Sequence, residues 1–229
     1  MRAAVLAAVL TASPIQGLGA QAEPSHIAFP TGDGGRIHAD LYGRGTRGVV
    51  LAHGGRFDKG SWGPQARQLE EAGYRVLALD FRGYGASTGP GQEDPLSAPL
   101  HLDVLGAVRY LRTIGVETVA VVGGSMGGAA AADAAIEAEP GEIDALVILA
   151  ATAKGPPEQI KGRKLFVVAQ GDTTAAGIPR LEAIRDQFDR AADPKELLVL
   201  DGAAHAQFLF ESDQGERLIR EILRFLSSP

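Results

Sequence analysis

A serine, an aspartate and a histidine are the residues whose types and positions suggest shared chemistry. Ser125 lies in the sequence Gly-Gly-Ser-Met-Gly-Gly, directly after an apolar run. Asp172 and His205 each follow a later apolar run within a few residues. A serine hydroxyl is a weak nucleophile until a base takes its proton, and a carboxylate can hold the base in the required tautomer. The three residues predict nucleophilic catalysis by Ser125, with His205 as general base and Asp172 as its orienting acid.

Each of these residues also has an ordinary structural explanation. Ser125 could cap a helix, Asp172 could cap a turn, and His205 could be a solvent-exposed loop histidine. Two other acids are lesser candidates for the orienting role: Asp201 precedes the histidine too closely, and Asp144 opens a strand. The chain order Ser, Asp, His, with each residue just after an apolar run, favours catalysis.

The glycines around Ser125 carry the most specific signal. The pattern G-x-S-x-G occurs where the apolar run 118–122 must turn sharply into an alanine-rich helix. Such a turn exposes the serine hydroxyl, and only small neighbours let the strand and the helix pack so closely. The start of the helix also favours a developing negative charge.

The elements that must position these residues alternate along the chain from residue 25 onward. Expected strands cover residues 25–30, 37–42, 48–52, 75–79, 118–122, 143–150, 164–169 and 196–200. Expected helices cover residues 65–72, 100–114, the run after Ser125, 179–191 and 211–226. This order predicts an α/β fold, a mostly parallel doubly wound sheet with an antiparallel N-terminal hairpin that turns at residues 31–35. Functional residues of such folds gather at the carboxyl ends of the strands.

The first 22 residues indicate a signal peptide rather than part of the fold. A positive start, an apolar run over residues 3–12 and the A-x-A pattern at residues 20–22 are typical of export. The alternative is an apolar helix that stays attached. We therefore expect an exported protein, periplasmic or extracellular, with one domain over residues 23–229. No later run has the length and apolar character of a transmembrane helix, and the segment between residues 150 and 164 is too short for a cap domain.

Composition excludes several function classes. The chain has 229 residues and a net charge of −6, which argues against nucleic acid or an anionic membrane surface as partner. It contains no cysteine, so thiolate catalysis and disulfides are excluded. Its five histidines show no ligand spacing, so we expect neither a metal nor another cofactor.

A further glycine turn, His53-Gly54-Gly55, follows the strand expected at residues 48–52. With this turn, the loop at residues 80–85, the Ser125 motif, Asp172 and residues 202–205, the chain resembles the α/β-hydrolase superfamily over nearly its whole mature length. It is most similar to compact, lidless esterases of the dienelactone-hydrolase and serine-aminopeptidase types. It differs from dienelactone hydrolases in having serine where they have cysteine.

The resemblance implies an oxyanion hole made by the backbone N–H groups of Met126 and Gly55, with Arg56 as the alternative second donor. His53 would brace the turn rather than act in catalysis, and Asp80 and Arg82 would tie loops together. Arg56, Trp62 and Tyr84 are possible pocket residues, which surface packing explains equally well.

These features predict a serine hydrolase that cleaves a small carboxylic ester through an acyl-enzyme on Ser125. A peptidase, amidase or thioesterase would use the same three residues, so these alternatives stay open. A non-catalytic binding module that kept the fold is a third class. The sequence specifies neither the acyl length nor the oligomeric state.

Overall fold

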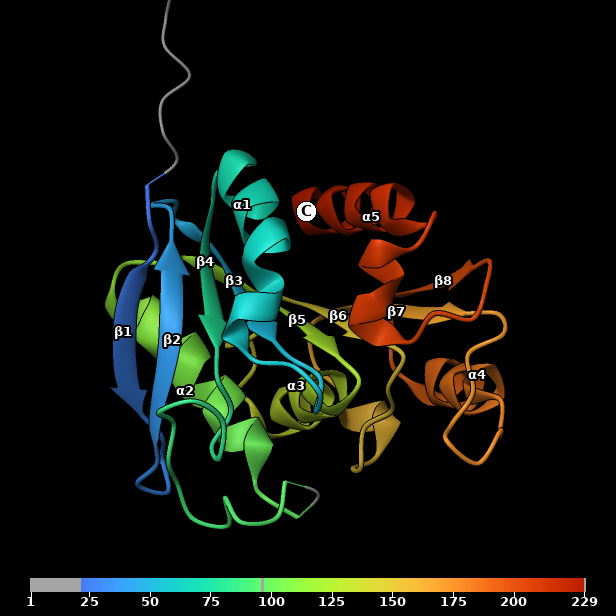
Figure 1. Ribbon diagram of the computed structural model, residues 1–229, viewed down its shortest axis with the longest axis horizontal. Helices are drawn as coiled ribbons and strands as arrows, with labels where there is room; N and C mark the ends of the chain where they lie inside the picture. Colours follow the sequence, from blue (N-terminus) through green and yellow to red (C-terminus); the bar gives the residue numbers. More distant parts are fainter. Residues whose placement is uncertain (1–21, 96, 229) are drawn as a thin grey trace, which may run out of the picture.

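A central sheet organises the protein (Figure 1). The computed structural model describes residues 22–95 and 97–228, and within them the sheet has eight strands in the order β1-β2-β4-β3-β5-β6-β7-β8. The strands are β1 (Ser25–Pro30), β2 (Arg36–Tyr42), β3 (Arg47–Ala52), β4 (Tyr74–Leu79), β5 (Thr118–Gly124), β6 (Ala145–Leu149), β7 (Arg163–Ala169) and β8 (Lys195–Leu200). The fully apolar β6 and the largely apolar β3, β5 and β7 lie in the interior of this order, where both faces are buried.

The directions of the strands confirm the predicted fold class. β1 pairs antiparallel with β2, and β2 pairs antiparallel with β4. All other pairs, from β3–β4 through β7–β8, are parallel. The hairpin between β1 and β2 is closed by the N–H of Thr31, which donates to the carbonyl of Gly35 at 2.9 Å. The protein is therefore an α/β domain with a mostly parallel sheet and an antiparallel N-terminal hairpin.

Helices cover both faces of the sheet. They are α1 (Gly63–Glu71), α2 (Leu100–Thr113), α3 (Met126–Glu137), α4 (Arg180–Arg190) and α5 (Gly215–Ser227). Helices α1 and α5 lie on one face, and α2, α3 and α4 lie on the other (Figure 1). Each face has its own apolar core, one packed beneath α1 and α5 and one beneath the other three helices. Within the described part of the chain, residues 150–162 hold only the short 3-10 helix η2 (Pro157–Gln159), and no cap is present.

The C-terminal segment differs from the single helix expected over residues 211–226. The chain instead forms the 3-10 helix η3 (Ala206–Glu211), a turn, and then α5. Gly215 at the start of α5 packs directly on η3, where an added Cβ would lie 2.3 Å from the carbonyl oxygen of Phe210, so glycine permits the close turn between the two helices. In that turn the N–H of Gly215 donates to the carbonyl of Ser212 at 3.0 Å.

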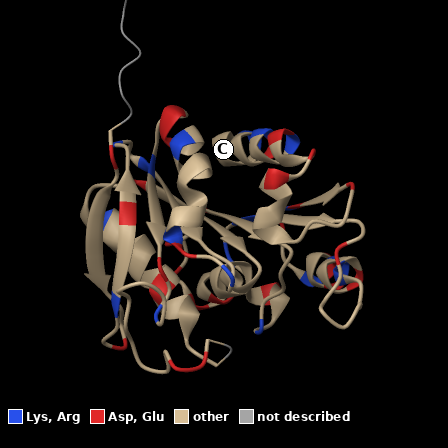
Figure 2. Cartoon of the chain, viewed as in Figure 1, with Lys and Arg blue, Asp and Glu red and all other residues tan. Residues whose placement is uncertain are grey.

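Charged residues of both signs are interspersed along the outer helices α4 and α5 (Figure 2). Several of them pair across elements, as Arg190 does with Glu158 at 2.9 Å. In residues 22–95 and 97–228, none of the helices has the length and apolar character needed to cross a bilayer. The predicted signal peptide, except for Ala22, lies outside the described residues.

Candidate active site

The register of the parallel strands brings the predicted residues to one edge of the sheet. Ala52 at the end of β3 pairs with Gly123, and Gly124 at the end of β5 pairs with Leu149 at the end of β6. Farther along the sheet, β7 and β8 end together, because Ala169 pairs with Leu200. The loops that follow β5, β7 and β8 therefore begin at the same edge, and they carry the serine, the aspartate and the histidine.

Ser125, His205 and Asp172 form a hydrogen-bonded chain. The Ser125 Oγ lies 2.8 Å from Nε2 of His205, and Nδ1 of the same ring lies 2.8 Å from Oδ2 of Asp172. The Asp172 side chain is 1% exposed, whereas that of His205 is 29% exposed. A buried carboxylate bound to Nδ1–H leaves Nε2 free to accept the serine proton. This is the geometry that nucleophilic catalysis by serine requires.

The backbone at Ser125 is strained in the way a sharp strand-to-helix turn requires. Its φ is 52° and its ψ is −116°, a conformation that residues with a side chain rarely adopt. The neighbouring glycines make the turn possible. A Cβ on Gly123 would lie 2.3 Å from the carbonyl oxygen of Gly127, and a Cβ on Gly127 would lie 2.2 Å from that of Ala52. Glycine at both positions therefore lets β3, β5 and α3 meet.

Backbone strain is concentrated near this serine. Besides Ser125, the non-glycine residues with positive φ in the described part of the chain are Ala150 and Ala206. Ala206 directly follows His205, and Ala150 follows β6 and lines a cavity beside Ser125. Strain of this kind costs about 1–3 kcal/mol per residue and is retained where function needs it.

The turn after β3 presents unused N–H groups next to α3. The carbonyl of Gly54 accepts a hydrogen bond from the N–H of Phe57 at 3.0 Å, which closes a tight turn. The N–H of Gly54 itself donates to Oε1 of Gln207 at 2.7 Å. Among the described residues, the N–H groups of Gly55, Arg56 and Met126 have no acceptor. An oxyanion could therefore draw on Met126 and on either residue of the turn.

His53 and Tyr84 hold this turn from behind. Nδ1 of His53 lies 2.9 Å from the carbonyl oxygen of Gly54, and its Nε2 accepts a hydrogen bond from the N–H of Phe81 at 3.2 Å. These two bonds require a neutral ring with its proton on Nδ1. Burial lowers the pKa of His53, which favours the same neutral form. The Tyr84 hydroxyl donates to the carbonyl of Gly55 at 3.1 Å.

Gln207 is a residue of the site that sequence reasoning missed. It lies two positions after His205 on η3, is 5% exposed, and binds the turn through Gly54. Its Nε2 also donates to Oγ of Ser61 at 2.9 Å. A glutamine in a loop carries no pattern that distinguishes it from a surface residue. Only its proximity to His205 in the sequence could have drawn attention to it.

The possible pocket residues take different positions. Trp62 is completely buried and packs edge-on against Phe210, with ring centroids 5.7 Å apart, so it belongs to the core and not to a pocket wall. Arg56 is exposed at the tip of the turn, and Tyr84 is half-buried against His53.

The acids and bases of the 80–85 loop bind other loops. Both oxygens of the Asp80 carboxylate accept hydrogen bonds from Lys59, at 2.8 Å from its N–H and 2.7 Å from its Nζ. Arg82 is fully buried and pairs with Asp103 and Asp33. The Arg82 hydrogen bond holds the pKa of Asp33 well below its usual range. These contacts connect the hairpin, the loop and α2.

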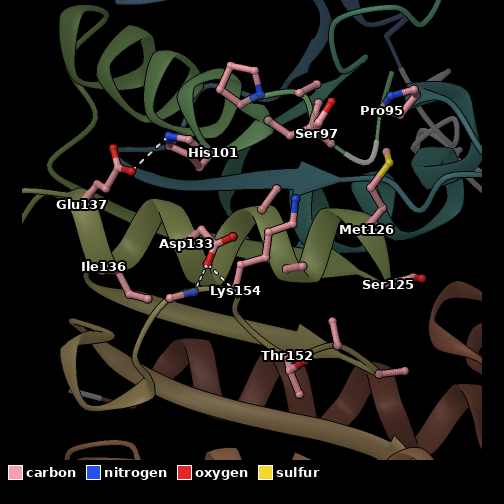
Figure 3. Close-up of a pocket in the computed structure, with 18 of the residues that line it drawn as sticks. Pro95, Ser97, His101, Ser125, Met126, Asp133, Ile136, Glu137, Thr152 and Lys154 are labelled. Atoms are coloured by element: carbon pink, nitrogen blue, oxygen red, sulfur yellow. Dashed lines mark hydrogen bonds and ion pairs between the residues drawn. The ribbon is translucent and has the colours of Figure 1, made fainter. Parts of the chain in front are cut away.

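A cavity of about 700 Å³ opens beside Ser125 (Figure 3). It runs along α3, between Pro95 and residues 97–101 on one side and residues 150–155 on the other. His101 lies on its wall and pairs with Glu137 at 3.1 Å. Arg180 also lines the cavity, and its Nε lies 3.7 Å from Oδ1 of Asp172.

In the part of the chain that the structure describes, no group of three acidic or histidine side chains could hold a metal ion.

Comparison with known proteins gives a family and a set of related folds. The alpha/beta hydrolase fold family matches the chain over residues 48–211. A 2-hydroxy-6-oxononadienedioate/2-hydroxy-6-oxononatrienedioate hydrolase from Paraburkholderia phymatum is 30% identical over 156 residues, which cover 64% of this chain and 52% of that protein. A bifunctional epoxide hydrolase 2 from Sus scrofa is 36% identical over 97 residues, or 42% of this chain and 17% of that protein. The chain spans about half the length of the first of these relatives.

Solved structures of similar size have the same architecture. An esterase from Pyrococcus furiosus superimposes with a TM-score of 0.73 at 18% identity, over 94% of this chain and 100% of that one. A dienelactone hydrolase from Anabaena variabilis gives a TM-score of 0.69 at 21% identity, over 89% of this chain and 97% of that one. At this level of identity, the likeness concerns the fold.

Proposed function

The chain belongs to the alpha/beta hydrolase fold family, and from this premise we propose that it is a serine hydrolase that cleaves carboxylic esters. The observation that carries the proposal is the hydrogen-bonded chain from Ser125 through His205 to Asp172. A reactive serine, a base and a buried acid in contact are the minimum for acyl transfer at neutral pH.

The first half of the proposed reaction transfers the acyl group to the enzyme. Oγ of Ser125 attacks the ester carbonyl carbon while its proton moves to Nε2 of His205. Asp172 stabilises the imidazolium that forms, and the negative oxygen of the tetrahedral intermediate accepts hydrogen bonds from Met126 and from Gly55 or Arg56. The intermediate then collapses, and His205 returns the proton to the leaving alkoxide, which departs as the alcohol.

The second half regenerates the serine. Water attacks the acyl-enzyme carbonyl as His205 takes one of its protons, and the new tetrahedral intermediate again places its charge at the free N–H groups. Collapse of this intermediate breaks the bond to Oγ, which recovers the proton from His205. The carboxylic acid is released, and the ester has consumed one water.

Turnover of a nitrophenyl ester by the purified protein tests the proposal. The Ser125→Ala variant should lose activity by about four to six orders of magnitude. Labelling of the wild type by a fluorophosphonate, and not of this variant, should show the reactive serine directly. Equal rates in the two proteins, or the absence of an adduct, would favour the alternative of a non-catalytic binding module. Amide and thioester substrates of matched acyl group would separate the peptidase, amidase and thioesterase alternatives.

A keto dioic acid is a second candidate substrate class, because the curated relative from Paraburkholderia phymatum is named for one. Such a compound has a ketone but no ester, so its hydrolysis would add water across a carbon–carbon bond next to the ketone, which becomes a carboxylic acid while the released carbon takes up a proton. The observation that favours this class is Arg180, a cation on the wall of the cavity beside Ser125. Its acidic neighbour, Asp172, is already bound to His205. Direct comparison of 2-hydroxy-6-oxononadienedioate with nitrophenyl esters as substrates would decide between the two classes.

A further inference from the structure

The cavity beside Ser125 is elongated along α3. Figure 3 shows Ser125 and Met126 at one end of α3, and the pair formed by His101 and Glu137 toward the other end. Ser125, Ala129 and Asp133 are spaced four residues apart, so they follow one another along one face of the helix. The cavity is therefore a groove that begins at the proposed nucleophile and continues along α3.

The position of His205 identifies which part of an ester would enter this groove. In the proposed reaction the alcohol leaves on the side of His205, because that ring delivers the proton to the departing oxygen. Ser125 and Met126 line the groove, whereas His205 is absent from the described residues that line it. We therefore assign the alcohol to the side of His205 and the groove to the acyl group.

Small and apolar side chains line much of the groove, which Arg180 also lines. The small side chains of Ala129 and Ala151 and the apolar side chains of Pro99 and Leu100 line it. The distance along α3 from Ser125 to Asp133 is about 12 Å at the rise of an α-helix. An extended carbon chain advances about 1.25 Å per carbon, given a bond length of about 1.5 Å. The apolar part therefore has room for about eight to ten carbons.

Charged groups with partners of their own mark the far end. The Asp133 carboxylate accepts hydrogen bonds from the N–H groups of Lys154 and Gly155 at 2.8 and 3.1 Å. Beyond it, His101 pairs with Glu137. Covering such groups with hydrocarbon removes water from them without a new bond, which is unfavourable. A longer chain gains nothing by extending into this end.

We propose that the groove along α3 binds the acyl chain of a medium-chain ester, with Ala129 as the residue that keeps it open. This inference rests on the proposed ester hydrolysis and adds the substrate class. Burial of each methylene should raise kcat/KM about three- to fourfold. The rise should continue from acetate to about octanoate and then level off, where the chain reaches Asp133.

Nitrophenyl esters of increasing acyl length, measured with wild type, Ala129→Leu and Ser125→Ala, test the inference. A leucine at position 129 fills the groove one helical turn from the serine. The ratio of kcat/KM for octanoate to that for acetate should therefore fall at least tenfold in this variant. Ala183→Leu is the matched control, because Ala183 is exposed on α4 and outside the cavity. Its ratio should equal that of the wild type.

The outcomes separate this inference from the proposed function. Hydrolysis that requires Ser125 but shows a flat or falling acyl profile in the wild type overturns the acyl groove and leaves the esterase intact. A profile that rises with the length of the alcohol, in acetates of longer alcohols, would also overturn it. Since the wild-type profile decides these cases, the test holds even if Ala129→Leu does not fold. Failure to hydrolyse any ester through Ser125 overturns the proposed function itself.

Discussion

Oε1 of Gln207 accepts a hydrogen bond of 2.7 Å from the N–H of Gly54, which joins the loop that carries His205 to the turn that carries the free N–H groups. The two residues are 153 positions apart in the sequence. Because Gln207 occupies the Gly54 N–H, only the next two residues of the turn can donate to an oxyanion. One side chain thus connects the position of the proposed base to the position of the proposed oxyanion hole.

Replacing Gln207 with alanine should lower kcat for ester hydrolysis by about ten- to a hundredfold, with a smaller change in KM. Removing one oxyanion donor lowers kcat by about two to three orders of magnitude. The expected loss is smaller than this, because the variant would displace the turn and its N–H groups without removing them. The buried N–H of Gly54 would also lose its acceptor, at a cost of about 1–3 kcal/mol in stability. Steady-state kinetics and urea unfolding measure the two effects.

Ser61→Ala is the matched control for this change. It removes the partner of the Gln207 Nε2 and leaves the bond to Gly54 in place. Its kcat should therefore be close to that of the wild type. If both variants had the same kcat, the bond between Gln207 and Gly54 would have no part in positioning the turn.

The neutral state of His53 should make stability depend on pH. Burial lowers the pKa of His53 in the folded protein below the ordinary value of 6.5. At a pH between the pKa of His53 in the folded protein and its pKa in the unfolded chain, the unfolded chain binds more protons. The free energy of unfolding therefore rises with pH in this range, and the contribution of His53 reaches its full value above about pH 6.5. It should fall by up to about 1.4 kcal/mol per pH unit as the pH drops below that value.

Urea unfolding at pH 7.5 and 5.5 measures this dependence. In His53→Gln the difference between the two pH values should be smaller than in the wild type, because the substituted side chain does not titrate. The other histidines contribute equally to both proteins. An unchanged difference would mean that His53 is protonated as easily in the folded protein as in the unfolded chain.

The fold class, and the meeting of Ser125, Asp172 and His205 at one edge of the sheet, could be predicted from the sequence. Strand runs such as those of β3, β5 and β7 are largely apolar, which is typical of a sheet covered on both faces, and the glycines around Ser125 identified the turn. The break between η3 and α5 was missed, because it involves the close packing of Gly215 on Phe210, which the periodicity of the segment does not reveal.

The surroundings of the three residues could not be predicted in the same way. Trp62 was expected as a possible pocket residue, but it lies in the apolar core and packs against Phe210. Gln207 and Ala129 have no distinctive type or spacing, and their positions depend on how loops distant in sequence meet. The wall of the groove combines residues from three separate segments, so its shape depends on the tertiary structure and could not be predicted from the sequence.

The close approach of β3 to α3 should make Gly127 intolerant of any side chain. A Cβ at Gly127 would lie 2.2 Å from the carbonyl oxygen of Ala52 and 2.6 Å from that of His53, both backbone atoms. Gly127→Ala should therefore destabilise the protein by about 1–3 kcal/mol or more and lower activity through the displaced turn. Gly63→Ala is the control: its φ is −48° and nothing lies within 4 Å of the added Cβ. Thermal unfolding should show equal or greater stability for the control, and a similar loss in both would refute the steric account.

Replacing Arg82 alone should destabilise the protein more than replacing Arg82 and Asp103 together. Its guanidinium is fully buried, and two of its nitrogens contact Oδ1 of Asp103 at 2.7 and 3.0 Å, while Asp103 is itself 0% exposed. Arg82→Met leaves that carboxylate buried without its cation, which should cost about 3–5 kcal/mol. The double variant Arg82→Met/Asp103→Leu replaces both charges by apolar groups, so it should recover a large part of the loss in urea unfolding. Asp33 loses its ion pair with Arg82 in both variants and keeps the hydrogen bond from Thr31, so it adds a similar cost to each. If the double variant lost as much unfolding free energy as Arg82→Met and Asp103→Leu lose separately, added together, the stability would come from packing and not from the ion pair.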